Sequence, residues 1–219
     1  MGRLTAQGII DLALDIVGNT RIEDNALSWL NLILDQAAQS HRFPDLEKQH
    51  SATVTDGIGT LAYPTDYGFL VKDRNSRAEG KFVSSDGLSV SRILQTSLGA
   101  TRDAVDHVAT SGGVPIRVAD DMLNAQWILH PIVNQSGTVY LNYQRNPATI
   151  TMSDVPWYPQ DAALVDVLAF YAERRQRGGQ IQIAAVLKEA SSRLARAAPS
   201  RAQLWRGGSG SGLDPSCFR

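Results

Sequence analysis

Hydrophobic positions recur every three or four residues near both ends of the chain, and they alternate with polar positions in its middle. In residues 5–19 the apolar side chains follow helical spacing and form one face. They are Ile9, Leu12, Ala13, Ile16 and Val17. Thr5 is suited to cap the start of a helix and Gly18 to end it. The pattern therefore predicts an amphipathic helix between these two residues.

A second helix is predicted directly after the first. Thr20 and Glu23 stand three residues apart, the spacing of a capping box. Two apolar stripes follow, one with Leu27, Leu30, Leu34 and Ala37, the other with Trp29 and Ile33. Two stripes indicate burial on two sides, in a bundle or in a subunit contact. The short link predicts an antiparallel helical hairpin that ends before Pro44.

The pattern changes to short strands and turns in residues 46–150. KFVSSDGLSVS has two β-rich arms around Asp86-Gly87, a pair suited to a type I′ hairpin turn. Val139, Leu141 and Tyr143 alternate with polar residues, as in a half-buried strand. We expect this region to be an antiparallel β domain.

Helical spacing returns after Pro159. This proline suits a first helical turn, and Asp161 suits the positive end of the helix dipole. The expected apolar face consists of Leu164, Val167, Leu168 and Tyr171. Gly178-Gly179 should break the helix. A last helix is expected to bury Ile183, Val186, Leu187, Ala190 and Leu194.

The order of elements predicts an α+β fold, with a helical bundle formed by both ends of the chain and an antiparallel β domain inserted between them. The expected parts are 1–45 for the N-terminal hairpin, 46–150 for the β domain, 151–198 for the C-terminal helices and 199–219 for a flexible Gly/Ser-rich tail. The GGSGSG run fits a native segment or an engineered linker, and the LDPSCFR sequence after it favours a native tail.

A proline-locked aromatic turn stands where the chain returns from the β domain to the bundle. It consists of Pro156, Trp157, Tyr158 and Pro159. The prolines restrict the backbone on both sides. We expect the two aromatic rings to wedge between the β and helical layers and to fix the angle between them.

Composition and charge narrow the classes of function only slightly. The chain has 219 residues, 43% hydrophobic and 20% charged, as in a globular protein with a substantial core. The formal net charge is −1, yet nine of the 21 basic residues follow residue 173, with only two acidic residues. This distribution fits a basic end that meets a negative partner, or a solvated helix face.

The sequence gives no indication of secretion or of membrane insertion. The single cysteine, Cys217, excludes an intrachain disulfide or a thiolate metal site. The first residues lack the pattern of a signal peptide, and no apolar run approaches the ~18 residues of a membrane span.

No catalytic, cofactor or metal motif stands out. The histidines, His41, His50, His107 and His130, lack metal-ligand spacing. Asp103 and His107 share a possible helix face, where such a pair is usually a surface contact. Asp120-Asp121 is best interpreted as a charged hairpin tip. We therefore expect neither an enzyme nor a bound cofactor or metal.

Four short sequences occur in a characteristic order. The helix pair ends near AAQSHRFPDLEKQ, and LAYPTDYGFL leads into the β region. GGVPIRV…WILHPIVNQSGTVYLNYQRNP contains a Gly-x-Pro strand, a strand ending in proline and a strand ending in Arg-x-Pro, and PWYPQDAALVDVLAFYAER joins a turn to a helix. Together, over residues 5–197, they resemble the head-to-tail connector (adaptor, or head-completion) proteins of tailed bacteriophages. Tyr63 and Tyr158 depart from that family's pattern.

The resemblance implies a structural virion protein rather than an enzyme. Copies would form a ring, twelvefold by resemblance, between the portal protein and the next neck or tail protein. The ring would extend the DNA channel, and packaged DNA would pass without sequence-specific binding. Its place would be the head–tail interface of the virion, after assembly in the host cytoplasm.

The resemblance also implies that the C-terminal segment docks onto the portal. The matching positions are Arg196, Arg201, Leu204, Trp205, Arg206, Leu213, Phe218 and Arg219. The basic charge of this segment could pair with an acidic portal surface.

Three other functions stay open at this point. The first is a nucleic-acid-binding module that uses the basic C-terminal helix, and it predicts salt-sensitive affinity for DNA. The second is another neck or tail component. The third is a hydrolase around Asp103 and His107 or around Asp120 and Asp121.

Overall fold

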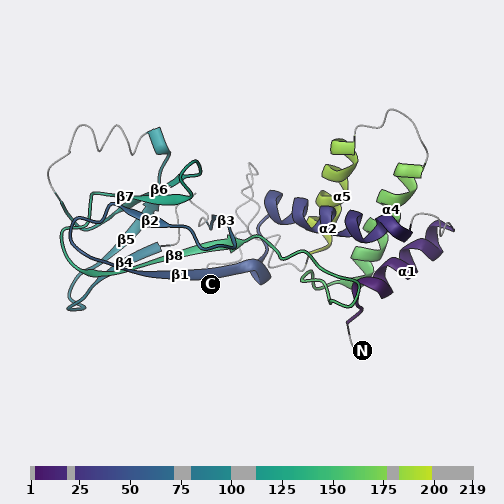
Figure 1. Cartoon of the computed structure of the whole chain (residues 1–219), viewed down its shortest axis with the longest axis horizontal. Coiled ribbons are helices and arrows are strands. Elements are labelled where there is room, and N and C mark those ends of the chain that lie inside the picture. The colour runs from purple at the N-terminus through teal and green to yellow at the C-terminus, as the bar shows by residue number, and fades with distance from the viewer. Residues whose placement is uncertain (1–2, 19–22, 72–79, 100–111, 177–182, 199–219) are drawn as a thin grey trace, which may run out of the picture.

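The molecule is elongated, with helices at one end and strands at the other (Figure 1). The computed structural model describes residues 3–18, 23–71, 80–99, 112–176 and 183–198. This part of the chain contains four α-helices and a large mixed sheet, which confirms the predicted α+β class. The tail, residues 199–219, lies outside the described residues.

The helices come from the two ends of the described sequence. They are α1 (Ala6–Val17), α2 (Glu23–Ser40), α4 (Asp161–Gln176) and α5 (Ile183–Ala197), with a 3-10 turn at Pro44–Leu46. The predicted limits of α1 are confirmed, because Thr5 Oγ1 accepts from Gly8 N at 3.3 Å and Gly18 closes the helix with φ 68°. Thr20 of the predicted capping box lies outside the described residues.

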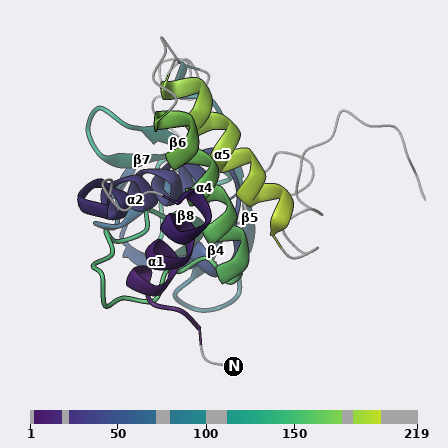
Figure 2. The ribbon, with the colours of Figure 1, turned by 90° about the vertical axis from the view of Figure 1, so that its right-hand side faces the viewer.

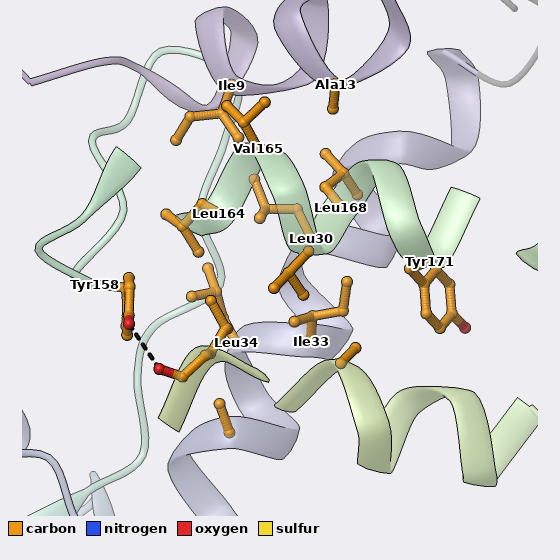
Figure 3. Close-up of a cluster of buried hydrophobic side chains, with 14 of the residues drawn as sticks. Ile9, Ala13, Leu30, Ile33, Leu34, Tyr158, Leu164, Val165, Leu168 and Tyr171 are labelled. Carbon is orange, nitrogen blue, oxygen red and sulfur yellow. Dashed lines mark hydrogen bonds between the residues drawn. The ribbon is translucent and has the colours of Figure 1, made fainter. Parts of the chain in front are cut away.

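All four helices contribute to one hydrophobic core. α4 packs against α1, α2 and α5 (Figure 2). Figure 3 shows side chains of this core, among them Ile9, Ala13, Leu30, Ile33, Leu34, Leu164, Val165, Leu168 and Tyr171. Both apolar stripes of α2 pack against other helices of the same chain, since Leu30 of one stripe and Ile33 of the other are each 1% exposed. The faces predicted for α4 and α5 are buried, except that Ile183 is 47% exposed.

The strands form an eight-stranded sheet. They are β1 (Glu47–Val54), β2 (Thr60–Ala62), β3 (Tyr67–Leu70), β4 (Gly80–Ser84), β5 (Val90–Gln95), β6 (Arg117–Asp121), β7 (Gln126–His130) and β8 (Gly137–Arg145). Their order is β1-β8-β4-β5-β6-β7-β2. β3 pairs with residues 143–145 of β8, and β4 pairs with residues 137–141 of the same strand. β1 and β8 run along the long axis toward the helices (Figure 1). Phe82, Trp127, Leu129, Val139 and Leu141 are fully buried in a second hydrophobic core.

The prediction of a purely antiparallel β region is wrong at one pair. β5 and β6 run parallel, with Leu94 opposite Arg117 and Gln95 opposite Val118. Parallel neighbours need a connection of about a dozen residues or more. Residues 96–116 provide that length, whereas the other sequential pairs are joined by short turns.

The hairpin of β4 and β5 is confirmed, but its type I′ turn is not. A type I′ turn needs positive φ at both central residues. Only Gly87 has a positive φ, 72°, while Asp86 does not. Gly87 N instead donates to Ser84 O at 2.9 Å, and Asp86 accepts from Leu88 N at 3.0 Å. The loop between β4 and β5 is longer than the two residues of a type I′ hairpin, and the Asp86 side chain stabilises it by this hydrogen bond.

Candidate functional site at the junction of the two cores

The chain crosses between the helical core and the β core twice, and polar side chains hold both crossings by hydrogen bonds. The first crossing runs from α2 through residues 41–46 into β1. The second runs from β8 through residues 146–160 into α4. For a fold with two cores, these crossings determine how rigidly one part is held on the other.

Gln144, near the end of β8, joins the sheet to the end of α2. Its side chain is 1% exposed. Nε2 donates to Ala38 O at 2.5 Å and to His41 O at 2.8 Å, and Oε1 accepts from Phe43 N at 2.7 Å. The last carbonyls of a helix lack partners within the helix. Gln144 satisfies two carbonyls there and one amide with a single planar group, so it attaches β8 to α2 in one orientation.

Asn31 holds the second crossing to the middle of α2. Its Oδ1 accepts from Ile150 N at 2.8 Å, and its Nδ2 donates to Ile150 O at 3.0 Å and to Leu27 O at 3.1 Å. The side-chain amide of Asn31 therefore pairs with both the backbone N–H and the backbone C=O of Ile150, as a residue of a neighbouring strand would.

The first turn of α1 secures the same crossing farther along. Ala6 N donates to Asp154 O at 2.8 Å, and Gln7 N donates to Met152 O at 3.0 Å. The first amides of a helix have no partner within it, so the crossing segment completes the start of α1. Residues 150–154 are thus held by two helices.

The aromatic turn packs inside the helical core. The Phe43 ring lies 4.9 Å from Trp157 and 6.0 Å from Tyr158, between centroids, in edge-to-face geometry. Tyr158 is fully buried and Trp157 is half-buried against the same core. Phe43 belongs to the first crossing and the turn to the second, so this contact joins the two crossings.

Polar contacts around Tyr158 anchor the turn on both sides. Its hydroxyl donates to Leu194 O in α5 at 2.7 Å, drawn as a dashed line in Figure 3. Burial raises the pKa of Tyr158 to about 12, so the phenol keeps the proton it donates. The Arg3 guanidinium donates to the Tyr158 carbonyl oxygen. Asp161 accepts from Leu4 N at 2.8 Å and pairs with Arg3 at 3.2 Å.

Asp120 and Asp121 stand at the end of the β6–β7 hairpin, but their carboxylates are held by hydrogen bonds. Asp121 is 2% exposed and accepts from Asn124 Nδ2 at 2.7 Å. Asp120 accepts hydrogen bonds from Tyr67, from Tyr63 at 3.4 Å and from Gln95 at 2.8 Å. The expected place at a hairpin end is confirmed, because Asp121 pairs with Gln126 across the turn between β6 and β7. The carboxylates there accept hydrogen bonds from neighbouring side chains.

The tyrosines of this cluster act as permanent donors. Burial, together with the neighbouring Asp120 carboxylate, raises the pKa of Tyr63 and Tyr67 above the usual value. The Tyr67 ring packs on Trp127, with centroids 5.2 Å apart. The cluster thus stabilises the β core.

Three arginines of the basic C-terminal part rest on aromatic rings. Arg193 lies 3.7 Å above the Phe170 ring and Arg174 lies 5.5 Å from it, while Arg175 lies 5.9 Å from the Trp29 ring. These contacts are cation–π interactions within the chain. Arg175 and Trp29 are far apart in sequence, so sequence analysis could not pair them, whereas Arg174 and Phe170 stand four residues apart on α4.

The other predicted sites fall partly outside the described residues. Among the portal-docking positions Arg196 is exposed in the last turn of α5, and the remaining seven lie beyond residue 198. Asp103 and His107 also lie outside. Within the described ranges, no three His, Cys, Asp or Glu side chains are grouped as metal ligands. No helix described is long and apolar enough to cross a membrane.

Sequence analysis also missed Gln144 and Asn31. Gln144 stands in a strand in which polar and apolar residues alternate, and Asn31 stands in a helix, so each looks like an ordinary solvated position.

Comparison with known proteins gives one family. The family model described as SU10 adaptor protein matches residues 4–211. This match spans both hydrophobic cores and both crossings. A search of curated proteins finds no match.

Proposed function

The chain belongs to the SU10 adaptor protein family, a bacteriophage adaptor family, and from that premise we propose that copies form a ring that connects the portal to the neck or tail. Membership makes the protein a structural component of the head–tail region of a virion. The observation that carries the proposal is the family match over residues 4–211, because it includes every element of the described fold.

We assign separate tasks to the parts of the chain. Residues 1–45 and 151–198 form the helical bundle of the ring, and residues 46–150 form the inserted β domain. The presence of two hydrophobic cores supports this division. Residues 199–219 form a tail that orders on its partner, since a Gly/Ser-rich segment gains little by folding alone.

The ring is twelvefold in this proposal, and packaged DNA passes through its lumen without sequence-specific contacts. The partners are the portal protein on one side and a neck or tail protein on the other. The assembled ring has no catalytic task, and it joins the virion after assembly in the host cytoplasm.

A rigid junction supports a ring-forming role. In a closed ring, an angular error in one copy is repeated in every copy and prevents closure. Gln144, Asn31 and the turn around Trp157 and Tyr158 hold the two crossings by hydrogen bonds and ring contacts. The proposal therefore makes Pro156–Pro159 part of the domain junction.

Electron microscopy of the purified protein mixed with the portal of the same virus tests the ring. We expect closed rings with one rotational symmetry, attached coaxially to the portal, and a matching mass in analytical ultracentrifugation. Particles that remain monomeric both alone and with the portal would refute the proposal.

A truncation after Ala198 tests portal docking by the tail. We expect the shortened protein to fold, by circular dichroism, and to lose portal binding in a pull-down. A full-length variant with residues 199–219 in permuted order keeps the charge and length of the tail. If portal binding needs the tail sequence, both variants fail to bind. Undiminished binding by the truncated protein would refute tail docking.

A further inference from the structure

Two exposed helix faces at the helical end of the molecule have complementary chemistry. α1 and α5 each pack against α4, and they flank it on different sides (Figure 2). A ring with head-to-tail contacts needs two different faces on every copy, one for each neighbour. The outward sides of α1 and α5 are the candidates within the described helices.

The α1 face is acidic and apolar. Asp11, Leu12, Asp15 and Ile16 are exposed along one side of the helix. Leu12 is 47% exposed and Ile16 is 63% exposed. Ile16 lines an open groove along α4, together with Asp166 and with Arg193 of α5. The carboxylates of Asp15 and Asp166 have no hydrogen bond or ion pair with a described residue.

The α5 face is basic and carries small side chains. Ala184, Ala185 and Lys188 are exposed on it, followed by Arg196. Arg193 is also exposed, but it lies over the Phe170 ring of α4 and lines the same groove as Ile16. Its one acid, Glu189, pairs with Arg193 at 2.9 Å, so the face keeps a positive excess. Among the described residues the Lys188 ammonium has no partner. Small side chains such as the two alanines allow another helix to approach closely.

We propose that the α1 face of one copy packs against the α5 face of the next copy in the ring. Leu12 would lie against the alanines, and Asp15 would face Lys188. This inference rests on the ring proposed above and names the surfaces that close it. A two-fold contact between α1 faces is disfavoured because it would bring Asp11 and Asp15 against the same carboxylates of the partner.

The partner is therefore a second copy of this chain rather than an unrelated protein. The two faces have opposite charge, lie on two different helices that both pack against α4, and belong to the same polypeptide. Contact with the neighbour would bury two large apolar side chains that are otherwise exposed, and it would supply cations to acidic groups that lack partners.

A charge exchange tests the contact. Asp15→Lys and Lys188→Glu are compared with the double variant carrying both changes, by sedimentation over a range of concentrations and by electron microscopy, with the portal present and absent. Asp56→Lys is the matched control, because Asp56 is an exposed acid in the turn after β1. Asp15 is in the last turn of α1, where a cation is favourable, so its replacement should not unfold the helix.

We expect each single variant to self-associate about tenfold more weakly, the double variant to regain most of the loss, and the control to match the wild type. Ring formation by wild type and both single variants at the same concentrations would overturn this inference and leave the ring itself intact. A wild type that forms no ring even with the portal would overturn the proposed function as well.

Discussion

Replacing Gln144 with leucine should destabilise the fold far more than an ordinary strand substitution. Leucine has a similar volume but has no hydrogen-bonding atoms. The change removes the acceptor of Phe43 N and removes the Nε2 donor from the carbonyls of Ala38 and His41. Because the side chain is 1% exposed, water cannot simply replace it.

The expected magnitude follows from those three groups. A buried amide left without an acceptor costs about 1–3 kcal/mol. Each carbonyl retains a second lone pair, so we assign about 0.5 kcal/mol to each. The sum is a loss of about 2–4 kcal/mol in the free energy of unfolding, a large part of the stability of a typical domain.

Urea denaturation followed by tryptophan fluorescence and circular dichroism measures this loss. Gln49→Leu is the control, since Gln49 is exposed on β1 and bonds only the side chain of Asn142. We expect the control to stay within about 0.5 kcal/mol of the wild type.

A second replacement separates hydrogen bonding from shape. Gln144→Glu keeps an acceptor for Phe43 N but places a carboxylate against two carbonyl oxygens. Burial would raise the pKa of that carboxyl in the folded state, so the destabilisation should shrink as the pH falls and the group becomes protonated. If Gln144→Leu unfolds at the same urea concentration as the wild type, the junction does not depend on this side chain and the reasoning is refuted.

The aromatic turn and the acid response provide two other tests. Trp157→Ala should lower the free energy of unfolding by about 2–4 kcal/mol in calorimetry, because a half-buried indole leaves a cavity beside Phe43; an unchanged melting temperature would contradict this. The hydrogen bond from Lys48, supported by that from Tyr143, holds the pKa of Asp66 below 3.8. Its contribution to stability is complete above pH 3.8 and is lost as the pH falls through the folded-state pKa. Asp66→Asn should therefore flatten the fall of the melting temperature below about pH 4, and an identical profile would exclude this role.

The helices and hairpins were largely predictable because their signals are local. Thr5 and Gly18 delimit α1 as expected, and the spacing of Leu164 and Leu168 identified a buried face of α4. The buried face of a helix requires an apolar residue every three or four positions, so the helix can be identified from a single sequence. The same holds for the alternation in β8.

The junction was less predictable because its contacts join distant residues. The proline-aromatic turn attracted notice as a sequence feature, yet its ring partner, Phe43, is more than a hundred residues away. The neighbouring sequence does not mark Gln144 or Asn31 as junction residues. A polar side chain in a strand or helix can face solvent, or it can bond a distant segment of the chain.

The α+β class, the helix and hairpin positions and the likeness to phage adaptors follow from the sequence alone, because they depend on periodicity, capping residues and the order of short motifs. Three features required the folded structure: the parallel pairing of β5 and β6, the hydrogen bonds from the tyrosine cluster to Asp120, and the attachment of the sheet to α2 by Gln144. These features arise from contacts between segments far apart in the chain. Their geometry depends on how the two cores pack, which no local pattern records.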